Sequence, residues 1–315
     1  MGDLPILTLT LNPALDEATH VPRVRPGPKL RCAAPTVDPG GGGLNVSRAI
    51  RHMEGQSLAL VALGGAVGQE LAARLTAEGI CHRVLHSPGA TRRSLTVTED
   101  ETGRQFRFVM PGPVWSAEDQ ARALAALRDS ARPGGIVVIS GSQPPGVPDD
   151  FPAHLVAAAA GMAVVLDTSG RGLACAVDRP IPGLAVLRMD SDEAETLAGK
   201  KLVSPRDTAD FAQGLACAGV AQVVLVARGA EGNVMASQEG RLIARPPHVE
   251  VVSAVGAGDS FVAGLVLARS RGQDWHGALA LGTAAAAAAV MTPATALCRG
   301  EDVARLLPEV TLSAV

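Results

Sequence analysis

Short apolar runs alternate along the chain with alanine-rich segments whose apolar residues recur at helical spacing. The runs are rich in β-branched residues and are flanked by Gly or Asp, which is typical of buried strands. Strands that alternate with helices pair in parallel, and helices cover both faces of the resulting sheet. The sequence therefore predicts an α/β protein with a three-layer αβα arrangement around a mostly parallel sheet. The expected strands are residues 58–63, 136–139, 163–166, 184–187 and 223–226, and the expected helices are 44–54, 69–78, 118–131, 151–160, 207–218, 257–270, 275–291 and 301–307.

Two stretches break this alternation. Residues 15–39 are rich in Pro and in charged residues, and residues 92–112 contain two strand-like runs, 94–98 and 105–110, around an acidic turn. Two such runs joined by a short turn predict a hairpin. We expect the two stretches to form a small antiparallel sheet, inserted as a lid into one domain that spans residues 1–315.

Composition excludes several classes of function. The net charge of −3, from 28 Lys and Arg against 31 Asp and Glu, argues against a nucleic-acid surface. No Tyr, two Trp and five Phe leave few rings on which bases could stack. The longest apolar stretch, residues 283–291, is too short to cross ~30 Å of hydrocarbon. Five cysteines without a CxxC pair indicate reduced, mostly buried thiols, so we expect a cytoplasmic protein without nucleic-acid or membrane partners.

The segment Val255-Gly256-Ala257-Gly258-Asp259-Ser260 directly precedes an expected helix. Its glycines allow backbone N–H groups to converge at the helix N-terminus, where the helix dipole favours an anion. An Asp in the first turn could accept a proton from a hydroxyl group held beside that anion. A GxGD pattern arises by chance in roughly one such sequence in five. By itself the motif therefore also fits an ordinary turn before a helix.

Four consecutive glycines, Gly40–Gly43, open the expected helix 44–54. Without side chains they allow a ligand to approach the backbone closely, and Asn45 could donate a hydrogen bond to a hydroxyl group. A flexible linker is the alternative. Because a linker that leads directly into an amphipathic helix is less usual, the pattern favours a binding loop.

Other chemical motifs are absent or weak. The chain has neither the Gly-Lys-Ser/Thr of a Walker A loop nor a GxSxG nucleophile motif. His82 and His86 lie four residues apart in a strand-like stretch, where that spacing does not direct both rings at one metal ion. Lys29 is the only lysine before residue 200 in a chain with 25 Arg and three Lys. A lysine in this context is consistent with a compact charge at a phosphate group.

Together with Leu9–Asp16 and Ser140–Gly146, these motifs resemble the ribokinase-like (PfkB) family of sugar kinases over nearly the whole chain. Residues 29–32, 39–43 and 107–112 are most similar to the minor, type II bacterial 6-phosphofructokinases of that family. The resemblance implies ATP-dependent phosphorylation of D-fructose 6-phosphate to fructose 1,6-bisphosphate. Alternatives are a 1-phosphofructokinase or tagatose-6-phosphate kinase, although many of these carry a Lys in the glycine loop. A non-catalytic phosphosugar-binding protein is an alternative of another class.

The resemblance also implies a role for each motif. Asp259 would be the catalytic base, and Gly256, Ala257 and Gly258 would form the anion hole for the transferred phosphoryl group. The residues expected to hold the sugar phosphate, with the last two at its existing phosphate, are Asp16, Gly41, Gly42, Asn45, Ser142, Lys29 and Arg92. The lid would close over the sugar and exclude water, and its pairing between subunits would make a homodimer.

The nucleotide side shows one departure from the family. After the strand the family has Lys-Pro-Asn, with Glu three residues beyond the Asn, whereas this chain has Arg188-Met189-Asp190 and then Glu193. Glu193 matches the residue of the Mg²⁺ and phosphate network, and Asp190 places a carboxylate where relatives have an amide. The segment 292–296 also departs from relatives, so no monovalent-cation site is carried over. The residues expected to bind ATP are Arg188, Asp190, Arg228, Gly229 and Gly232.

Overall fold

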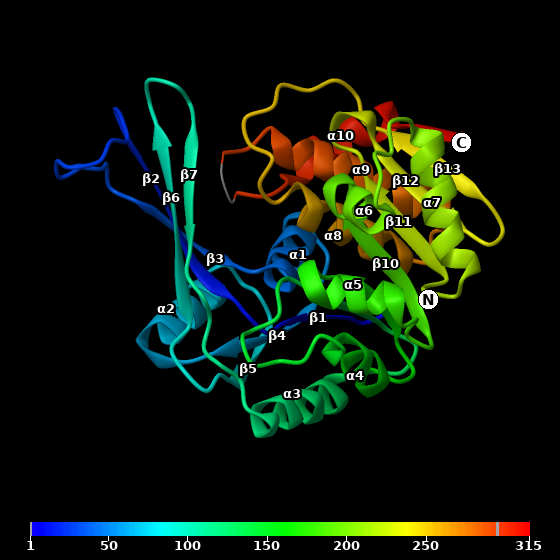
Figure 1. The fold of residues 1–315 in the computed structure, drawn as a ribbon, viewed down its shortest axis with the longest axis horizontal. Coiled ribbons are helices and arrows are strands. Elements are labelled where there is room, and N and C mark those ends of the chain that lie inside the picture. Colours follow the sequence, from blue (N-terminus) through cyan, green and yellow to red (C-terminus); the bar gives the residue numbers. More distant parts are fainter. Residues whose placement is uncertain (1, 294–295) are drawn as a thin grey trace.

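A large twisted sheet runs through the part of the chain that the structure, a computed structural model, describes: residues 2–293 and 296–315 (Figure 1). In that part the sheet has ten strands in the order β14-β13-β12-β11-β10-β9-β8-β1-β4-β5. The strands from β11 to β5 in this order pair in parallel, whereas β12, β13 and β14 add an antiparallel edge. Their bounds are β1 Ile6–Thr10, β4 Leu58–Leu63, β5 His82–His86, β8 Ile136–Ser140, β9 Ala163–Asp167, β10 Leu184–Asp190, β11 Val223–Ala227, β12 Asn233–Ser237, β13 Arg241–Arg245 and β14 Thr311–Ala314.

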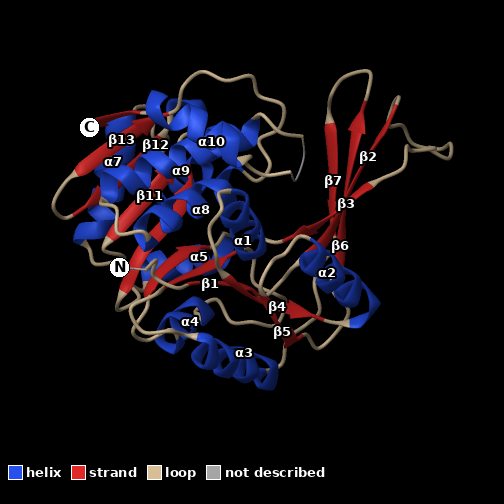
Figure 2. Ribbon diagram, turned by 180° about the vertical axis from the view of Figure 1, so that it is seen from behind, coloured by secondary structure: helices blue, strands red, loops and turns tan. Residues whose placement is uncertain are grey.

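Helices cover both faces of this sheet, as Figures 1 and 2 show. One face packs against α3, α4, α5, α6 and α7, and the other against α1, α8, α9 and α10, while α2 covers the β4 end. This arrangement confirms the predicted three-layer αβα fold. The helices are α1 Gly42–His52, α2 Gly65–Ala77, α3 Ala117–Ser130, α4 Phe151–Ala158, α5 Gly170–Asp178, α6 Ser191–Ala198, α7 Pro205–Cys217, α8 Ala257–Ser270, α9 Trp275–Val290 and α10 Gly300–Leu306.

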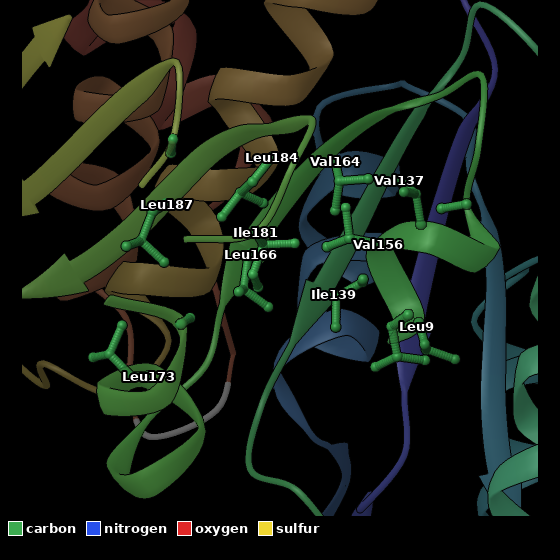
Figure 3. Close-up of a cluster of buried hydrophobic side chains, with 14 of the residues drawn as sticks. Leu9, Val137, Ile139, Val156, Val164, Leu166, Leu173, Ile181, Leu184 and Leu187 are labelled. Carbon is green, nitrogen blue, oxygen red and sulfur yellow. The ribbon is translucent and has the colours of Figure 1, made fainter. Parts of the chain in front are cut away.

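Burial on both faces explains why the central strands are continuous apolar runs. Successive side chains of a strand point to opposite faces of the sheet. In β8, Val137 and Ile139 belong to the cluster under α3–α5 that Figure 3 shows, whereas Ile136 and Val138 belong to the cluster under α1, α8 and α9. Every residue of this strand is buried. A polar residue on either face loses its hydration and needs a hydrogen-bond partner, which Ser140 at the end of β8 finds in Asp167.

A second sheet stands apart from the first and forms the lid (Figures 1 and 2). Its strands β2 (Ala14–Val21), β3 (Thr36–Gly40), β6 (Arg92–Glu99) and β7 (Gln105–Val109) lie in the order β3-β2-β6-β7. The predicted inserted sheet is therefore confirmed, but the expectation that it is wholly antiparallel is wrong. Strands β2 and β6 pair in parallel, because each leaves the core and enters the lid in the same direction instead of being joined by a hairpin.

Some elements went unpredicted. Helices α5 and α6 have nine and eight residues, which is too short for an unambiguous periodic signal. The antiparallel edge β12–β14 interrupts the expected alternation, and its last strand follows the helical C-terminal part. The two central residues of segment 292–296, Ala294 and Thr295, lie outside the described residues.

The cysteines are free, but most of them are exposed. All five cysteines are free, as expected. Only Cys175 and Cys298 are buried, so the prediction of mostly buried thiols is wrong: Cys32, Cys81 and Cys217 are exposed. Among the described helices, none is both long and apolar enough to cross a bilayer.

Helices α8 and α9 approach each other through glycines. A Cβ atom at Gly264 would lie 2.7 Å from the carbonyl oxygen of Leu281, and one at Gly282 would lie 2.8 Å from that of Phe261. Most of the alanine run in α9 is buried in the same layer. Small side chains thus allow this helix pair to pack closely beneath the sheet.

We predict opposite effects for two Gly→Ala substitutions in helices. Gly264→Ala should lower the free energy of unfolding by about 1–3 kcal/mol, because the added methyl group overpacks the α8–α9 contact. Gly214→Ala in α7 is the matched control: a Cβ atom there meets nothing within 4 Å, so the better helix former should raise stability by about 0.5–1 kcal/mol. Urea unfolding measures both values. Equal effects at the two positions would contradict the packing argument.

Candidate active site

The candidate site lies where the carboxyl ends of the central strands face the lid. Strands β1, β8, β9 and β10 all run in the same direction, and ligands of open α/β sheets bind beyond such ends. A pocket of about 200 Å³ extends there from the lid strands β2, β6 and β7 to Gly41 and Val255. The pocket therefore joins the inserted sheet to the glycine loop and to the segment before α8.

Asp259 and Asn45, which are 214 positions apart in the sequence, meet in this region. Asn45 Nδ2 donates a hydrogen bond to Asp259 Oδ2 at 2.9 Å. Gly256, with φ of 79°, caps α8 in the left-handed conformation, and no described side chain caps this helix end. The first backbone N–H groups of α8 thus lie beside the Asp259 carboxylate, where the helix end favours an anion; among them, Ala257 N donates a long bond of 3.4 Å to the Ala254 carbonyl oxygen.

The surroundings of Asp259 disfavour its ionised form. Burial, followed by the nearby Asp167 carboxylate, raises the pKa of Asp259 to about 7, although the Asn45 hydrogen bond and the Arg188 charge act in the opposite direction. A carboxyl group with a pKa near neutrality is suited to accept and release a proton at physiological pH.

Asp167, at the end of β9, is a site residue that the sequence reasoning missed. Its Oδ1 accepts from Arg188 Nη1 at 3.2 Å, and its Oδ2 accepts from Ser140 Oγ at 3.0 Å. Burial alone would lower the pKa of Arg188, but the carboxylates of Asp167, Asp259 and Glu193 together more than offset it, so the pKa is raised. The available signal was an acidic residue at the carboxyl end of an apolar strand, where ligand-binding residues gather.

Arg188 lies directly beside the expected anion hole. A Cβ atom at Gly258 would lie 2.8 Å from Arg188 Nη2. A side chain at position 258 would therefore displace the guanidinium. The positive charge of Arg188 is held next to the N-terminus of α8, adding to the favourable potential for an anion there.

The four glycines form a tightly packed loop, and the alternative of a flexible linker is wrong. A Cβ atom at Gly40 would overlap the Asp16 carboxylate. Gly41 has φ of 124° at the N-cap of α1 and lines the pocket. A Cβ atom at Gly42 would overlap Ser140 Oγ. Side chains at these positions would displace the loop from the residues around it.

Asp16, Arg92 and Arg107 line the pocket together. Burial raises the pKa of Asp16, although Arg92, Ser94 and Arg107 each act to lower it. Arg107 was noted in the sequence only as part of a family-like segment, and it belongs to the candidate site. Gln105, Phe108 and Val109 of β7 line the same pocket, so no alternation in the sequence singles out Arg107.

The Arg92 guanidinium is held rigidly by backbone carbonyl groups. Its Nε and Nη2 donate to the carbonyl oxygen of Asn12 at 3.3 and 3.1 Å, and Nη1 donates to that of Met110 at 3.1 Å. A guanidinium has five N–H donors, so two remain for a ligand. Ser142 is placed near the same point, because its Oγ accepts from Asn12 Nδ2 at 3.1 Å.

Four residues expected to hold the sugar phosphate do not line the pocket: Gly42, Asn45, Ser142 and Lys29. The first three contact other residues of the site, namely Ser140, Asp259 and Asn12, whereas Lys29 lies apart from it. It is exposed on the loop between β2 and β3, and it is not among the residues that line the pocket.

The expected ATP contact of the Arg228 guanidinium needs correction. This side chain is buried, and it donates to the carbonyl oxygens of Leu202 and Val203, to Thr208 Oγ1 and to the Glu231 carboxylate. It therefore ties the loop before α7 to the following turn. Gly229 and Gly232, with φ of 56° and 111°, shape that turn.

Asp190 has a local structural role. Its carboxylate accepts from Glu193 N at 2.9 Å, and Glu193 Oε2 accepts from Asp190 N at 2.9 Å, which makes a capping box at the start of α6. Asp and Asn are equally good N-caps, so a carboxylate at this position keeps the cap that an amide would make. Burial raises the pKa of Glu193, and the Asp190 charge adds to this effect.

Comparisons with known proteins match this arrangement. The model of the pfkB family carbohydrate kinases matches residues 9–301. The chain belongs to this family. It is 39% identical over 306 residues to the ATP-dependent 6-phosphofructokinase isozyme 2 of Mycobacterium tuberculosis, covering 96% of this chain and 89% of the relative. It is 34% identical to the 1-phosphofructokinase of Xanthomonas campestris, covering 84% of each.

A solved structure extends the likeness to three dimensions. The phosphofructokinase-2 of Escherichia coli in complex with fructose-6-phosphate matches with a TM-score of 0.89 and 34% identity, covering 97% of this chain and 99% of the other. As a pfkB family member, the chain is an ATP-dependent sugar kinase with the ribokinase-like fold.

We predict that Asp259→Asn stabilises the fold in a pH-dependent way. A carboxyl group with a folded pKa near 7 and an unfolded pKa near 3.8 destabilises the native state increasingly as pH rises from about 4 to about 7. The variant should therefore gain roughly 2–4 kcal/mol over the wild type at pH 8 and much less at pH 4.5. Urea unfolding at both pH values tests this. A gain that is independent of pH would rule out the raised pKa.

Proposed function

We propose that this pfkB family kinase transfers the γ-phosphoryl group of ATP to the 1-hydroxyl group of D-fructose 6-phosphate, giving fructose 1,6-bisphosphate. The observation that carries the proposal is the pocket in which Arg92 and Arg107 face Asp16 beside Gly41. Two guanidinium groups suit an acceptor that already carries a phosphate group, since arginine binds phosphate bidentately. A carboxylate and a glycine loop suit the sugar hydroxyl groups.

The catalytic step needs a base, an oriented hydroxyl group and a stabilised phosphoryl group. In the proposal Asp259 accepts the proton of the hydroxyl group while its oxygen attacks the γ-phosphorus and ADP leaves. The N–H groups of Gly256, Ala257 and Gly258 stabilise the charge of the transferred group, for which the Ala257 N–H gives up its 3.4 Å bond to the Ala254 carbonyl oxygen. Asn45 holds the Asp259 carboxylate through the 2.9 Å hydrogen bond, so the base keeps its orientation.

The residues fit a magnesium ion that is brought by the nucleotide. Among the described residues, no group of three or more His, Cys, Asp and Glu is placed to hold a metal ion. Magnesium in kinases is bound through one or two carboxylates together with substrate phosphates and water. Glu193 keeps one carboxylate oxygen outside its capping bond, and it would hold the ion through water. The ion would neutralise phosphate charge, and Arg188, Gly229 and Gly232 would flank the nucleotide.

We also propose that the chain forms one kinase domain with an inserted lid and acts as a cytoplasmic homodimer. Phe108, Val109 and Met110 on the lid are large apolar residues exposed to solvent. Their burial against a second lid would be favourable, and Lys29 on the neighbouring loop would then be available to a site at the interface.

Two other acceptors and one non-catalytic function are alternatives to this proposal. The similarity to 1-phosphofructokinases supports the same chemistry on fructose 1-phosphate, and tagatose 6-phosphate differs from fructose 6-phosphate at one hydroxyl group. A non-catalytic phosphosugar-binding protein is disfavoured, because the Asp259–Asn45 pair and the open end of α8 are intact.

A coupled ADP-release assay across fructose 6-phosphate, fructose 1-phosphate, tagatose 6-phosphate and fructose tests the proposal. We expect the highest kcat/KM with fructose 6-phosphate. Fructose should be at least about 10²-fold poorer, because it lacks the group that Arg92 and Arg107 bind. Preference for another phosphate ester would select the corresponding alternative. Binding without ADP release from any acceptor would favour the binding protein.

The base assignment predicts the pH dependence of the reaction. Since Asp259 must be ionised to accept a proton, kcat/KM should rise with pH and level off above about 7, following the pKa of Asp259. Asp259→Asn should lower kcat by about 10²–10⁴ and leave the affinity for sugar phosphate within a few fold. Calorimetric titration checks the affinity. A variant that retains more than about a tenth of the wild-type kcat would exclude Asp259 as the base.

A further inference from the structure

The Arg48 guanidinium lies where the lid, the glycine loop and α2 meet. The side chain is only 5% exposed. Its Nε and Nη2 donate to the two carboxylate oxygens of Glu78, the C-cap residue of α2, at 2.7 and 3.2 Å. Its Nη1 donates to the carbonyl oxygen of Pro39 at 3.1 Å, and Nη2 lies 3.7 Å from Asp38 Oδ1. One buried cation on α1 thus holds both α2 and strand β3.

These contacts end next to the pocket. Pro39 directly precedes Gly40, whose backbone packs against the Asp16 carboxylate without room for a side chain. Asp38 lies opposite Asp16 in the β2–β3 pair. Movement of the Pro39 end of β3 relative to β2 would therefore shift the glycine loop relative to Asp16. Asp38 acts as a like charge toward Asp16 and contributes to the raised pKa of that residue, and the Arg48 charge 3.7 Å from Asp38 opposes this effect.

The contacts of Arg48 described above lie on the sugar side of the site and not on its nucleotide side. Arg48 shares α1 with Asn45, so the residue that braces the loop and the partner of the base lie on one rigid helix. The residues assigned to the nucleotide belong to β10, α6 and the turn after β11, whereas the contacts of Arg48 described above are with Glu78, Pro39 and Asp38.

We propose that Arg48 is a positioning residue for the sugar-phosphate site: it fixes the glycine loop against Asp16 by anchoring β3 to α1 and α2. The inference rests on the proposed function, because it takes the ligand of the pocket to be a sugar phosphate. It assigns Arg48 a role in acceptor binding in addition to any role in stability.

The test compares the KM for the sugar acceptor, the KM for ATP and kcat. Arg48→Met removes the charge and all donors, while Glu78 and Asp38, 30% and 33% exposed, remain hydrated. We expect the acceptor KM to rise about tenfold or more, with the ATP KM within about twofold, because only the acceptor subsite is displaced. Arg48→Lys should give an intermediate acceptor KM, since a point charge cannot replace the planar fork of the guanidinium.

Arg74→Met is the matched control. Arg74 on α2 also donates to a β3 carbonyl group, that of Val37 at 2.8 Å, and pairs with Glu70 at 3.1 Å. It contacts the strand two residues before Pro39, away from the glycine loop. This variant should keep both KM values within about twofold of the wild type even if its melting temperature falls.

Several outcomes would overturn the inference. Wild-type KM values in Arg48→Met, equal increases for acceptor and ATP, or an equal effect of Arg74→Met would each reduce Arg48 to a structural role. If Arg48→Met does not fold, Arg48→Lys and Glu78→Gln test the inference in its place. Each should raise the acceptor KM and leave the ATP KM unchanged. The acceptor used is the sugar that the wild type phosphorylates best, so a preference other than fructose 6-phosphate would refute the substrate proposal separately. Failure to phosphorylate any sugar would overturn both.

Discussion

The hydrogen bond between Asn45 and Asp259 joins the N-termini of two helices that pack side by side beneath the sheet. Each helix is preceded by a glycine-rich loop, so both loops converge on one point at the carboxyl edge of the strands. The packing of Ile50 and Val46 with Phe261 and Leu265 fixes the two helices relative to each other. The position of the base, the open end of α8 and the glycine loop all depend on this pair.

The charges around this point are arranged at a cost to stability. Asp167 and Asp259 are acidic groups close to each other in a poorly hydrated region, and the single guanidinium of Arg188 is shared between them. A site that held Asp259 as a fully ionised, paired carboxylate would be more stable, but its base would be weaker. The raised pKa of Asp259 and the close approach of Arg188 to Gly258 thus both follow from the dense packing of charged side chains at this point.

The sequence was most informative where several local signals agreed. The apolar runs around residues 58–63 and 136–139 became buried parallel strands, because neither face of this sheet meets water. The glycine runs before α1 and α8 indicated binding loops, and both lie at the candidate site. Local reasoning failed where the partner of a residue is distant in the sequence. The Arg228 guanidinium is hydrogen-bonded to Leu202, Val203 and Thr208, and no local sequence pattern predicts such contacts.

Strand type, helix spacing and the chemistry of the two glycine loops follow from nearest neighbours in the chain, because propensity and hydrophobic periodicity are local properties. The parallel pairing of β2 with β6, the place of Asp167 beside Arg188 and the assembly of Asp16, Arg92 and Arg107 around one pocket are decided by contacts between segments far apart in the chain. The raised pKa of Asp259 likewise comes from burial and from charges on other strands. Burial and Coulomb interactions depend on distance in space, so these features exist only once the chain has folded.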